Sequence, residues 1–381
     1  MAGITAAVEL AETGKELVLL EKEARLGGKV SRFHNYFPKL CPPSCGLEIN
    51  FRRIRSSSRI QVHTHAEVMR IAGRKGDFTL QVRYHPRLIN SLCTSCGLCA
   101  AHCPEGAVLV PGGLAFPMLY DIDPERCLGE DCAKCLEVCA YDAIELNAPP
   151  RMIEMKAEEL ILATGWELYH PGKVEAYAYN READVITNLE MEELLASCTR
   201  DGSPFQRPSD GKKPTKVAFV QCAGSRDENH LSYCSAVCCS ASIKHALTLS
   251  ELSPDISSEI FYIDLRLSGR NEKLLQKAEA HPQVILTKGK VGRIHRGEEG
   301  PVLEVEDIMA GGKRMADFDL VVLAMGMVPR VVDGDVDLNR EGFYLAQQEN
   351  GLIVAGSCKR PMDVSSSVKD ATAAALKSMQ S

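Results

Sequence analysis

Two runs of closely spaced cysteines constrain the fold of this 381-residue sequence more than any other feature. The first run, Cys93 to Cys103, has the spacing C-x2-C-x2-C-x3-C and is followed by Pro104. Spacings of two residues let three thiolates surround one iron–sulfur cube, while the fourth, turned away before the proline, reaches a second cube. Zinc sites with four cysteines normally pair two C-x2-C units across a longer loop. The run therefore predicts [4Fe–4S] ligation of the ferredoxin type.

The second run, Cys127 to Cys139, has a longer first gap and carries Ala140 where proline is usual. In the crossed pattern of two-cluster ferredoxins, the fourth cysteine of each run serves the other cluster. The pattern assigns the ligands as follows: Cys93, Cys96, Cys99 and Cys139 to cluster one, and Cys127, Cys132, Cys135 and Cys103 to cluster two. Such clusters move single electrons, and a flavin is the group that couples single-electron steps to a two-electron reaction.

The amino-acid composition limits the possible partners and the cellular compartment of the protein. The chain has 45% hydrophobic residues, 16 cysteines and a formal net charge of −7. The negative charge argues against a nucleic-acid surface, and no apolar stretch reaches the roughly 18 residues that a membrane helix needs. Cysteines in metal-ligand spacing without a secretory signal predict a reducing cytoplasm. Any association with a membrane is then expected through partner subunits.

The N-terminal segment matches the second half of a dinucleotide-binding βαβ unit. Residues 2–13 form a predicted helix, residues 17–20 a predicted buried strand, and Glu21 ends that strand. Only Gly3 could be the last glycine of the G-x-G-x-x-G turn, so the first strand and the turn are missing and we interpret the sequence as a fragment or one with a misassigned start. Glu21 is expected to accept ribose hydroxyls, with a solvated strand end as the alternative. The other candidate contacts here are Gly27, Gly28 and Lys29, for which ordinary turn glycines and a solvated charge are the alternatives.

Three later strands each end at a glycine: residues 160–165, 320–326 and 351–356. This order resembles the disulfide-reductase type of flavoprotein, an α/β fold with two dinucleotide-binding domains, here with an inserted two-cluster ferredoxin domain. The resemblance adds Thr164, Gly165, Gly326 and Gly356 as flavin contacts. The expected division is residues 1–85, 149–214 and 317–381 for the FAD-binding domain, 86–148 for the insertion and 215–316 for a second Rossmann-like domain.

A third cysteine group replaces the expected nucleotide turn of the second domain. Cys222, Cys234, Cys238 and Cys239 follow a predicted strand, and Gly224 is not part of a G-x-G-x-x-G turn, so binding of NAD(P)H is not supported. From spacing alone the group could hold a third [4Fe–4S] cluster, form a redox-active thiol pair, or simply pack. A further pair, Cys41 and Cys45, is either a redox pair beside the flavin or structural.

The Cys–GSR–YCS–CC arrangement, the ferredoxin insertion and the FAD scaffold together resemble the A subunit of heterodisulfide reductase. That family ligates a cluster through such a cysteine set. Residues 37–53, 207–213, 219–235 and 260–266 also resemble the A subunit of the quinone-interacting membrane-bound oxidoreductase complex of sulfate reducers. The resemblance implies FAD, a peripheral cytoplasmic position, partner subunits, and electron transfer between a quinone-linked membrane partner and adenylylsulfate reductase.

One departure and two alternatives remain. The family's Gly-Asp motif reads Gly356-Ser357 here, which leaves Asp363 or main-chain groups to replace the usual aspartate contact to the flavin. A heterodisulfide reductase-like electron-bifurcating subunit is the second hypothesis, and a flavin-less scaffold subunit is the third.

Overall fold

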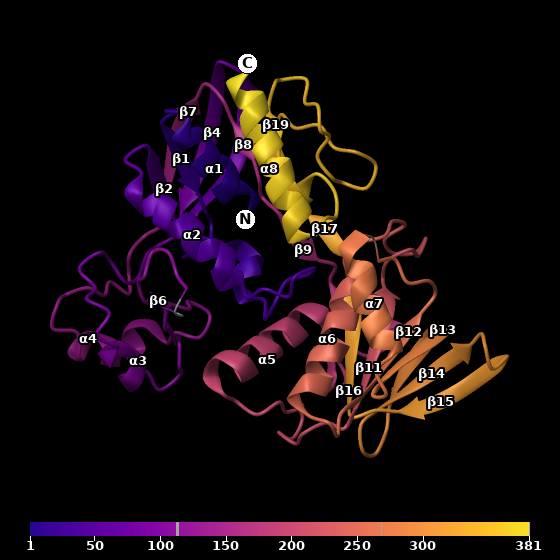
Figure 1. Cartoon of the computed structure of the whole chain (residues 1–381). Coiled ribbons are helices and arrows are strands. Elements are labelled where there is room, and N and C mark those ends of the chain that lie inside the picture. The colour runs from indigo at the N-terminus through magenta and orange to yellow at the C-terminus, as the bar shows by residue number, and fades with distance from the viewer. Residues whose placement is uncertain (112–113, 268, 381) are drawn as a thin grey trace.

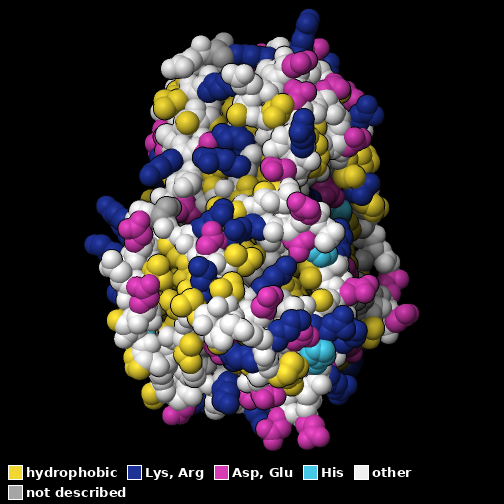
Figure 2. Space-filling view, turned by 90° about the vertical axis from the view of Figure 1, so that its right-hand side faces the viewer, with side chains coloured by type: hydrophobic (Ala, Val, Ile, Leu, Met, Phe, Trp, Pro, Cys, Tyr) yellow, Lys and Arg dark blue, Asp and Glu magenta, His cyan; other side chains and the backbone are white. Residues whose placement is uncertain are grey.

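The computed structural model describes residues 1–111, 114–267 and 269–380. Figure 1 shows three parts: a region built from both ends of the chain, a small insertion with little regular structure, and a second region around a large sheet. Figure 2 shows Lys and Arg interspersed with Asp and Glu on the face that it presents. None of the described helices is long and apolar enough to cross a membrane.

The first region begins with a helix–strand–helix–strand unit: α1 (Ala2–Glu12), β1 (Leu17–Leu20), the 3-10 turn η1 (Gly28–Arg32), α2 (Pro43–Ser56) and β2 (Ile60–His63). β1 and β2 are parallel, with Leu17 opposite Ile60. The apolar stripe of α1, which includes Ile4 and Val8, is buried against α2 and these strands. The C-terminal helix α8 (Val364–Met379) packs beside α1, so the two ends of the chain meet (Figure 1).

A second parallel pair lies in the same region: β8 (Ile161–Leu162) and β19 (Ile353–Val354). Alternate residues of a parallel strand bond to opposite sides. Leu17 and Glu21 donate to the β2 side, so the backbone groups of Val18 and Leu20 point away from β2. Within the described ranges, no backbone hydrogen bond joins β1 to β8. Residues 17–20 were expected to be buried, but Val18 is 42% exposed because β1 has a neighbour on one side only.

An antiparallel sheet with the order β18-β3-β4-β7 completes the first region. Its strands are β3 (Ala66–Arg74), β4 (Asp77–Tyr84), β7 (Arg151–Ala157) and β18 (Asp333–Gly334). Gly334 has φ +121°, and a Cβ there would lie 1.8 Å from the Ile71 carbonyl oxygen, so only glycine allows β18 to pair with β3.

The insertion leaves and rejoins this sheet between β4 and β7. Its elements are short: α3 (Leu98–His102), β5 (Val108–Leu109), β6 (Asp121–Ile122), the 3-10 turn η2 (Gly129–Asp131) and α4 (Lys134–Glu137). Its apolar core is small, and cysteines of both ferredoxin runs pack against it. So small a core needs a second source of stability, which bound clusters can supply.

The second region contains a seven-stranded sheet with the order β10-β16-β11-β12-β13-β14-β15. Its strands are β10 (Val185–Thr187), β11 (Lys216–Ala223), β12 (Ser257–Tyr262), β13 (Val284–Arg296), β14 (Pro301–Asp307), β15 (Gly312–Asp317) and β16 (Leu320–Met325). The pairs from β10 to β13 are parallel, and β13, β14 and β15 form an antiparallel meander. The helices are α5 (Asn188–Asp201), α6 (Cys238–Leu252) and α7 (Glu272–Glu279).

The second sheet extends beyond the expected division at residues 215 and 316. β10 and α5 come from before residue 215, and β16 comes from after residue 316. β16 is buried along its length because it lies between β10 and β11. The sequence pattern of residues 320–326 is that of a buried parallel strand, and such a pattern does not reveal which sheet the strand joins.

The remaining elements are short, and one pair of strands lies where the chain passes between the two regions. β9 (Trp166–Leu168) pairs antiparallel with β17 (Met327–Pro329) where the chain crosses between regions. The remaining 3-10 turns are η3 (Pro171–Lys173), η4 (Glu175–Tyr177), η5 (Gly269–Asn271) and η6 (Gly356–Cys358).

Candidate functional site

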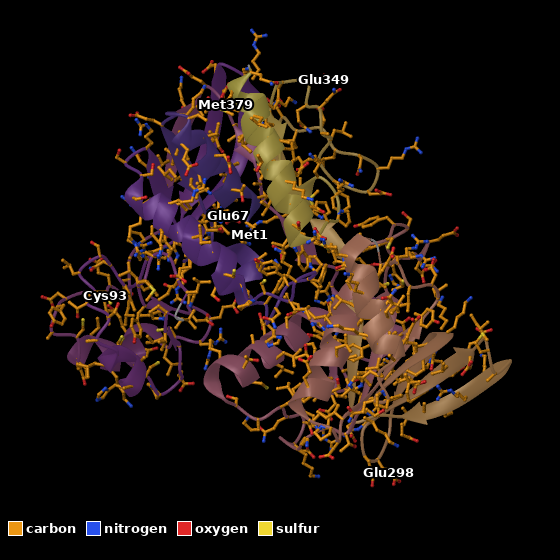
Figure 3. The ribbon with its side chains drawn as sticks, viewed as in Figure 1. Met1, Glu67, Cys93, Glu298, Glu349 and Met379 are labelled. Carbon is orange, nitrogen blue, oxygen red and sulfur yellow. The ribbon has the colours of Figure 1, made fainter. Side chains whose placement is uncertain are left out.

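A cavity of about 3350 Å³ lies between the two regions and the insertion. Its walls come from α1, β1, the loop after β1, residues of the insertion, and the helices α5 and α6. Pockets for small ligands usually measure about 300–1,000 Å³, so this one has room for an extended dinucleotide. Met1 and Glu67, which both line it, lie near the centre of the molecule in Figure 3.

Most of the flavin contacts expected from sequence meet in this cavity. Its lining includes Gly3, Glu21, Gly27, Gly28, Lys29, Thr164, Gly165 and Asp363. Gly326 instead packs against the third cysteine loop, where a Cβ would lie 2.4 Å from Ser225 Oγ. Gly356 packs against α1, with Ala2 Cβ 2.7 Å from where its own Cβ would be. Both positions require glycine for close packing, and neither lines the cavity.

The Glu21 carboxyl group, the candidate for ribose binding, belongs to a residue that lines the cavity. It lies at the end of β1, and its Oε1 accepts a hydrogen bond from Glu23 N at 3.1 Å. Burial raises the pKa of this carboxyl group, and the Glu23 N–H and the Met1 amine only partly offset that effect. A buried carboxylate with so few partners is suited to accept hydroxyl groups from a ligand.

The N-terminus of α1 faces the same cavity, since Met1, Ala2 and Gly3 line it. The first N–H groups of a helix have no partner within the helix, and together with its dipole they favour an anion. Burial lowers the pKa of the Met1 amine. These groups suit a pyrophosphate.

Lys29 and Asp363 already have protein partners. Lys29 Nζ lies 2.7 Å from Glu167 Oε2 and 5.3 Å from the centre of the Trp166 ring. Asp363 caps α8 by accepting a hydrogen bond from Ser366 N at 2.7 Å. Gly27, with φ +119°, lets the chain turn sharply beside the cavity wall, as expected for a close approach to a ligand.

A buried ionic cluster on α5 and α6 was not found from the sequence. Glu192 contacts Lys244, accepts a 2.7 Å hydrogen bond from His245 Nε2, and is itself held by His34 N at 3.0 Å. Burial alone would raise the pKa of Glu192, but His245 and Lys244 lower it to about 2. Lys244 is only 1% exposed, yet both it and Glu192 line the cavity. The available signal was an adjacent lysine and histidine on a helix whose one other charged residue is Glu251.

Buried polar atoms without hydrogen-bond partners indicate which kind of ligand the cavity lining suits. Among the described residues, His34 Nδ1, Asn188 Oδ1 and Arg25 Nε are buried without a hydrogen-bond partner, and all three residues line the cavity. Buried polar atoms normally have partners. A heterocycle rich in hydrogen-bonding atoms, such as a flavin dinucleotide, therefore fits this lining.

Some cysteines of each ferredoxin run lie near one another. Burial raises the pKa of the Cys99 thiol, and the nearby thiols of Cys93 and Cys96 add to this. Burial likewise raises the pKa of Cys135, whose neighbours include Cys127 of its own run and Cys103 of the first. Cys103 thus lies near Cys135 of the second run. Figure 3 shows Cys93 within the insertion, away from the large sheet.

The Cys103 thiol has a distinct environment. Burial would raise its pKa, but backbone N–H groups of residues 105–108 outweigh this and lower it. A thiolate surrounded by N–H donors suits ligation of a cluster. Among the described residues, no three or more His, Cys, Asp or Glu converge closely enough to hold a single metal ion.

The third cysteine group gathers at the start of α6. Burial raises the pKa of Cys238, and Cys239, Cys222 and Cys234 all lie near enough to raise it further. Val237 and Ala241, on either side of Cys238, line the cavity. The group therefore stands directly behind one cavity wall.

Cys41 and Cys45 lie together but apart from the cavity. Burial raises the pKa of the Tyr36 phenol, and both nearby thiols add to this shift. Neither cysteine lines the cavity, although the residues between them, Pro42 to Ser44, do. Both thiols are free.

Known proteins share this organisation. Residues 86–109 match the 4Fe–4S binding domain family, and residues 1–61 match the NAD(P)-binding Rossmann-like domain family. The fold resembles thioredoxin reductase of T. acidophilum, with a TM-score of 0.56, 15% identity and coverage of 99% of this chain and 93% of that one. It also resembles the Lactococcus lactis thioredoxin reductase, with a TM-score of 0.53, 14% identity and coverage of 100% of this chain and 95% of that one. The predicted fold class is confirmed.

Two relatives are similar to this chain in amino-acid sequence as well. The chain is 33% identical over 410 residues to the second iron-sulfur A subunit of the CoB--CoM heterodisulfide reductase of Methanopyrus kandleri, covering 99% of this chain and 62% of that protein. It is 32% identical over 413 residues to the A subunit of the H(2):CoB-CoM heterodisulfide,ferredoxin reductase of Methanothermobacter marburgensis, with the same two coverages. The chain thus spans about 62% of the length of these relatives. This chain is therefore similar over nearly its whole length to A subunits of heterodisulfide reductases, and it shares with iron–sulfur proteins a 4Fe–4S binding domain.

Proposed function

We propose that this chain is an FAD and iron–sulfur oxidoreductase subunit that passes electrons between a quinone-linked membrane partner and adenylylsulfate reductase. One observation carries the electron-transfer part of this proposal. The cavity lining includes residues of the ferredoxin insertion, such as Leu109 and Met118, and also Val237 and Ala241, which lie near the cysteines at the start of α6. A dinucleotide in that cavity would lie between the two sets of cluster ligands.

Several residues of the cavity have a proposed role in binding the cofactor. Glu21 would bind the ribose of the adenosine and the N-terminus of α1 the pyrophosphate, while Gly27 and Gly28 allow close approach of the backbone. FAD, when bound, can exchange electrons singly with clusters and in pairs with a two-electron couple. Lys244, held by Glu192 and by a 2.6 Å hydrogen bond to Asn35 O, places an amino group at the cavity wall, and burial lowers the pKa of this amino group despite the nearby Glu192.

The cluster assignments belong to the same proposal. Cluster one takes Cys93, Cys96, Cys99 and Cys139, cluster two takes Cys127, Cys132, Cys135 and Cys103, and a third takes Cys222, Cys234, Cys238 and Cys239. The gathering of Cys103 with Cys127 and Cys135 supports the crossed arrangement. Serine substitution tests it: Cys103→Ser should remove the EPR signal of cluster two, and Cys234→Ser that of the third cluster. Unchanged spectra in both variants would refute the assignment.

The choice of partners is supported by the sequence segments that resemble the quinone-interacting complex, and co-purification tests it. The affinity-tagged chain, purified without oxygen from its native cells, should retain subunits of a membrane complex. The reduced complex should then transfer electrons to adenylylsulfate reductase. Recovery of a hydrogenase or formate dehydrogenase instead would favour the second candidate, an electron-bifurcating subunit. The name of the Methanothermobacter marburgensis relative, which is part of a heterodisulfide,ferredoxin reductase, motivates that candidate.

The third candidate is a scaffold subunit that binds no flavin. It is favoured by Ser357, which stands where the family's Gly-Asp motif carries an aspartate. Extraction of flavin from protein purified under native conditions decides between the candidates, because a scaffold yields none.

A further inference from the structure

Arg25, in the loop after β1 of the first region, contacts the ferredoxin insertion directly. The Arg25 Nη2 atom donates hydrogen bonds to Leu109 O at 3.0 Å and to Leu119 O at 3.1 Å, and Nη1 donates to Val110 O at 3.4 Å. One side chain of the first region thus holds two segments of the insertion. Hydrogen bonds from a charged donor are stronger than neutral ones, so Arg25 is the main polar link at this contact.

Apolar contacts and a backbone bond reinforce this link. Leu26 N donates to Phe116 O at 2.8 Å, and the Phe116 ring stacks on Phe51 of α2 with centroids 5.6 Å apart. Leu114 and Phe116 pack against the core formed by α1, α2, β1 and β2. Leu114 and Phe116 therefore belong to the insertion in sequence and to the first region in packing, whereas Tyr120 and Ile122 pack in the core of the insertion.

Residues from the segment 114–122 form a wall of the cavity at the end where the adenosine is expected. Leu114, Ala115, Met118 and Asp121 line the cavity together with Glu21. A short chain of contacts places Asp121 near Glu21: Ala66 N donates to Glu21 O at 2.9 Å, and the neighbouring His65 Nε2 lies 3.7 Å from Asp121 Oδ1. The Nε atom of Arg25 is buried without a partner among the described residues, which leaves a donor for a ligand at this wall.

We propose that the ferredoxin insertion forms part of the dinucleotide site, covering the adenosine end, so that cluster loading and nucleotide binding strengthen each other. The proposal rests on the function proposed above. The small apolar core of the insertion is completed by cluster-ligating cysteines, so losing the clusters unfolds the insertion. The wall formed by residues 114–122 is then lost. Such coupling is reciprocal: bound clusters raise the affinity for the nucleotide by the same factor as bound nucleotide raises the affinity for the clusters.

The test compares ligands that share only part of FAD. FAD, ADP and FMN are titrated into cluster-loaded protein and into protein whose clusters have been removed with a chelator. We expect FAD and ADP, which carry the adenosine, to bind about tenfold or more tightly to the loaded form. FMN, which lacks the adenosine, should show no difference. Equal affinity of ADP for the two forms, or an FMN difference as large as that of ADP, would overturn the proposal.

A substitution isolates the contact. Arg25→Ala should abolish the difference between the two forms and increase hydrogen–deuterium exchange of residues 114–122 in cluster-loaded protein. Arg181→Ala is the matched control, since Arg181 also donates to a backbone carbonyl, Glu175 O at 2.7 Å, but lies in the second region. Unchanged exchange in Arg25→Ala would contradict the proposal even if no flavin bound. Absence of FAD binding in every form would instead refute the proposed function, and the exchange result would still decide whether Arg25 docks the insertion.

Discussion

The two parallel sheets of this chain differ in how far each is complete. In the second region β16 is flanked on both sides, and Val322 in it is fully buried. In the first region, among the residues that the structure describes, β1 pairs with β2 alone, and Val18 is 42% exposed. A run of aliphatic residues therefore shows what a strand can bury, whereas actual burial depends on which strands lie beside it. The first region depends more on what fills its cavity, and the second depends on its own core.

The largest expected effect concerns the ion cluster where the second region meets the cavity. Lys244→Ala should lower the free energy of unfolding by about 3–5 kcal/mol, because it leaves the Glu192 carboxylate buried with fewer positive partners. Urea denaturation followed by circular dichroism measures this. The double variant Lys244→Met with Glu192→Gln should recover part of the loss. A single variant as stable as the wild type would mean that the second region does not depend on this cluster.

The same cluster predicts a pH dependence. The folded-state pKa of Glu192 is about 2, below its ordinary value of 4.5. The stabilisation that this shift represents, about 3 kcal/mol, is present above pH 4.5 and is lost as the pH falls towards 2. The free energy of unfolding should therefore fall more steeply with acidification in the wild type than in Glu192→Gln. Parallel profiles for the two proteins would show that Glu192 titrates normally.

A matched pair of substitutions tests the difference between the sheets directly. Val322→Ala removes two methyl groups from the buried strand and should cost about 2 kcal/mol of unfolding free energy. Val18→Ala removes the same groups from the exposed edge and should cost about 0.5 kcal/mol. Equal costs would mean that β1 is as well packed as β16. If added FAD increases the cost of Val18→Ala, the empty side of β1 faces the bound cofactor.

The smallest contrast between the two regions concerns the starts of their helices. α5 begins with a capping box in which Glu190 N donates to Thr187 Oγ1 and Glu190 Oε2 accepts from Thr187 N at 2.6 Å. α1 has no side-chain cap. Thr187→Ala should therefore lower the unfolding free energy by about 1 kcal/mol, whereas a substitution at Met1 removes no cap. Thermal unfolding of the two variants measures the contrast, and an unchanged melting temperature for Thr187→Ala would contradict it.

Local sequence patterns predicted part of this molecule well. The ferredoxin runs could be interpreted directly because cluster ligands follow each other within a few residues, and Glu21 could be placed because it ends an obvious strand. The Glu192–Lys244–His245 cluster could not, since α5 and α6 meet only after the sheet has formed. The pattern of β16 predicted a buried strand correctly, but its sheet depends on long-range pairing. The contact between Arg25 and the insertion leaves no local pattern at all.

The central claim is that one chain holds a flavin between cluster sites, and cofactor content tests it most directly. Protein purified without oxygen should contain about twelve irons and one FAD per chain, and the reduced form should show EPR signals from three [4Fe–4S] clusters. About eight irons would remove the site formed by Cys222 to Cys239 and keep the ferredoxin pair. Protein with its irons but without flavin would contradict the account.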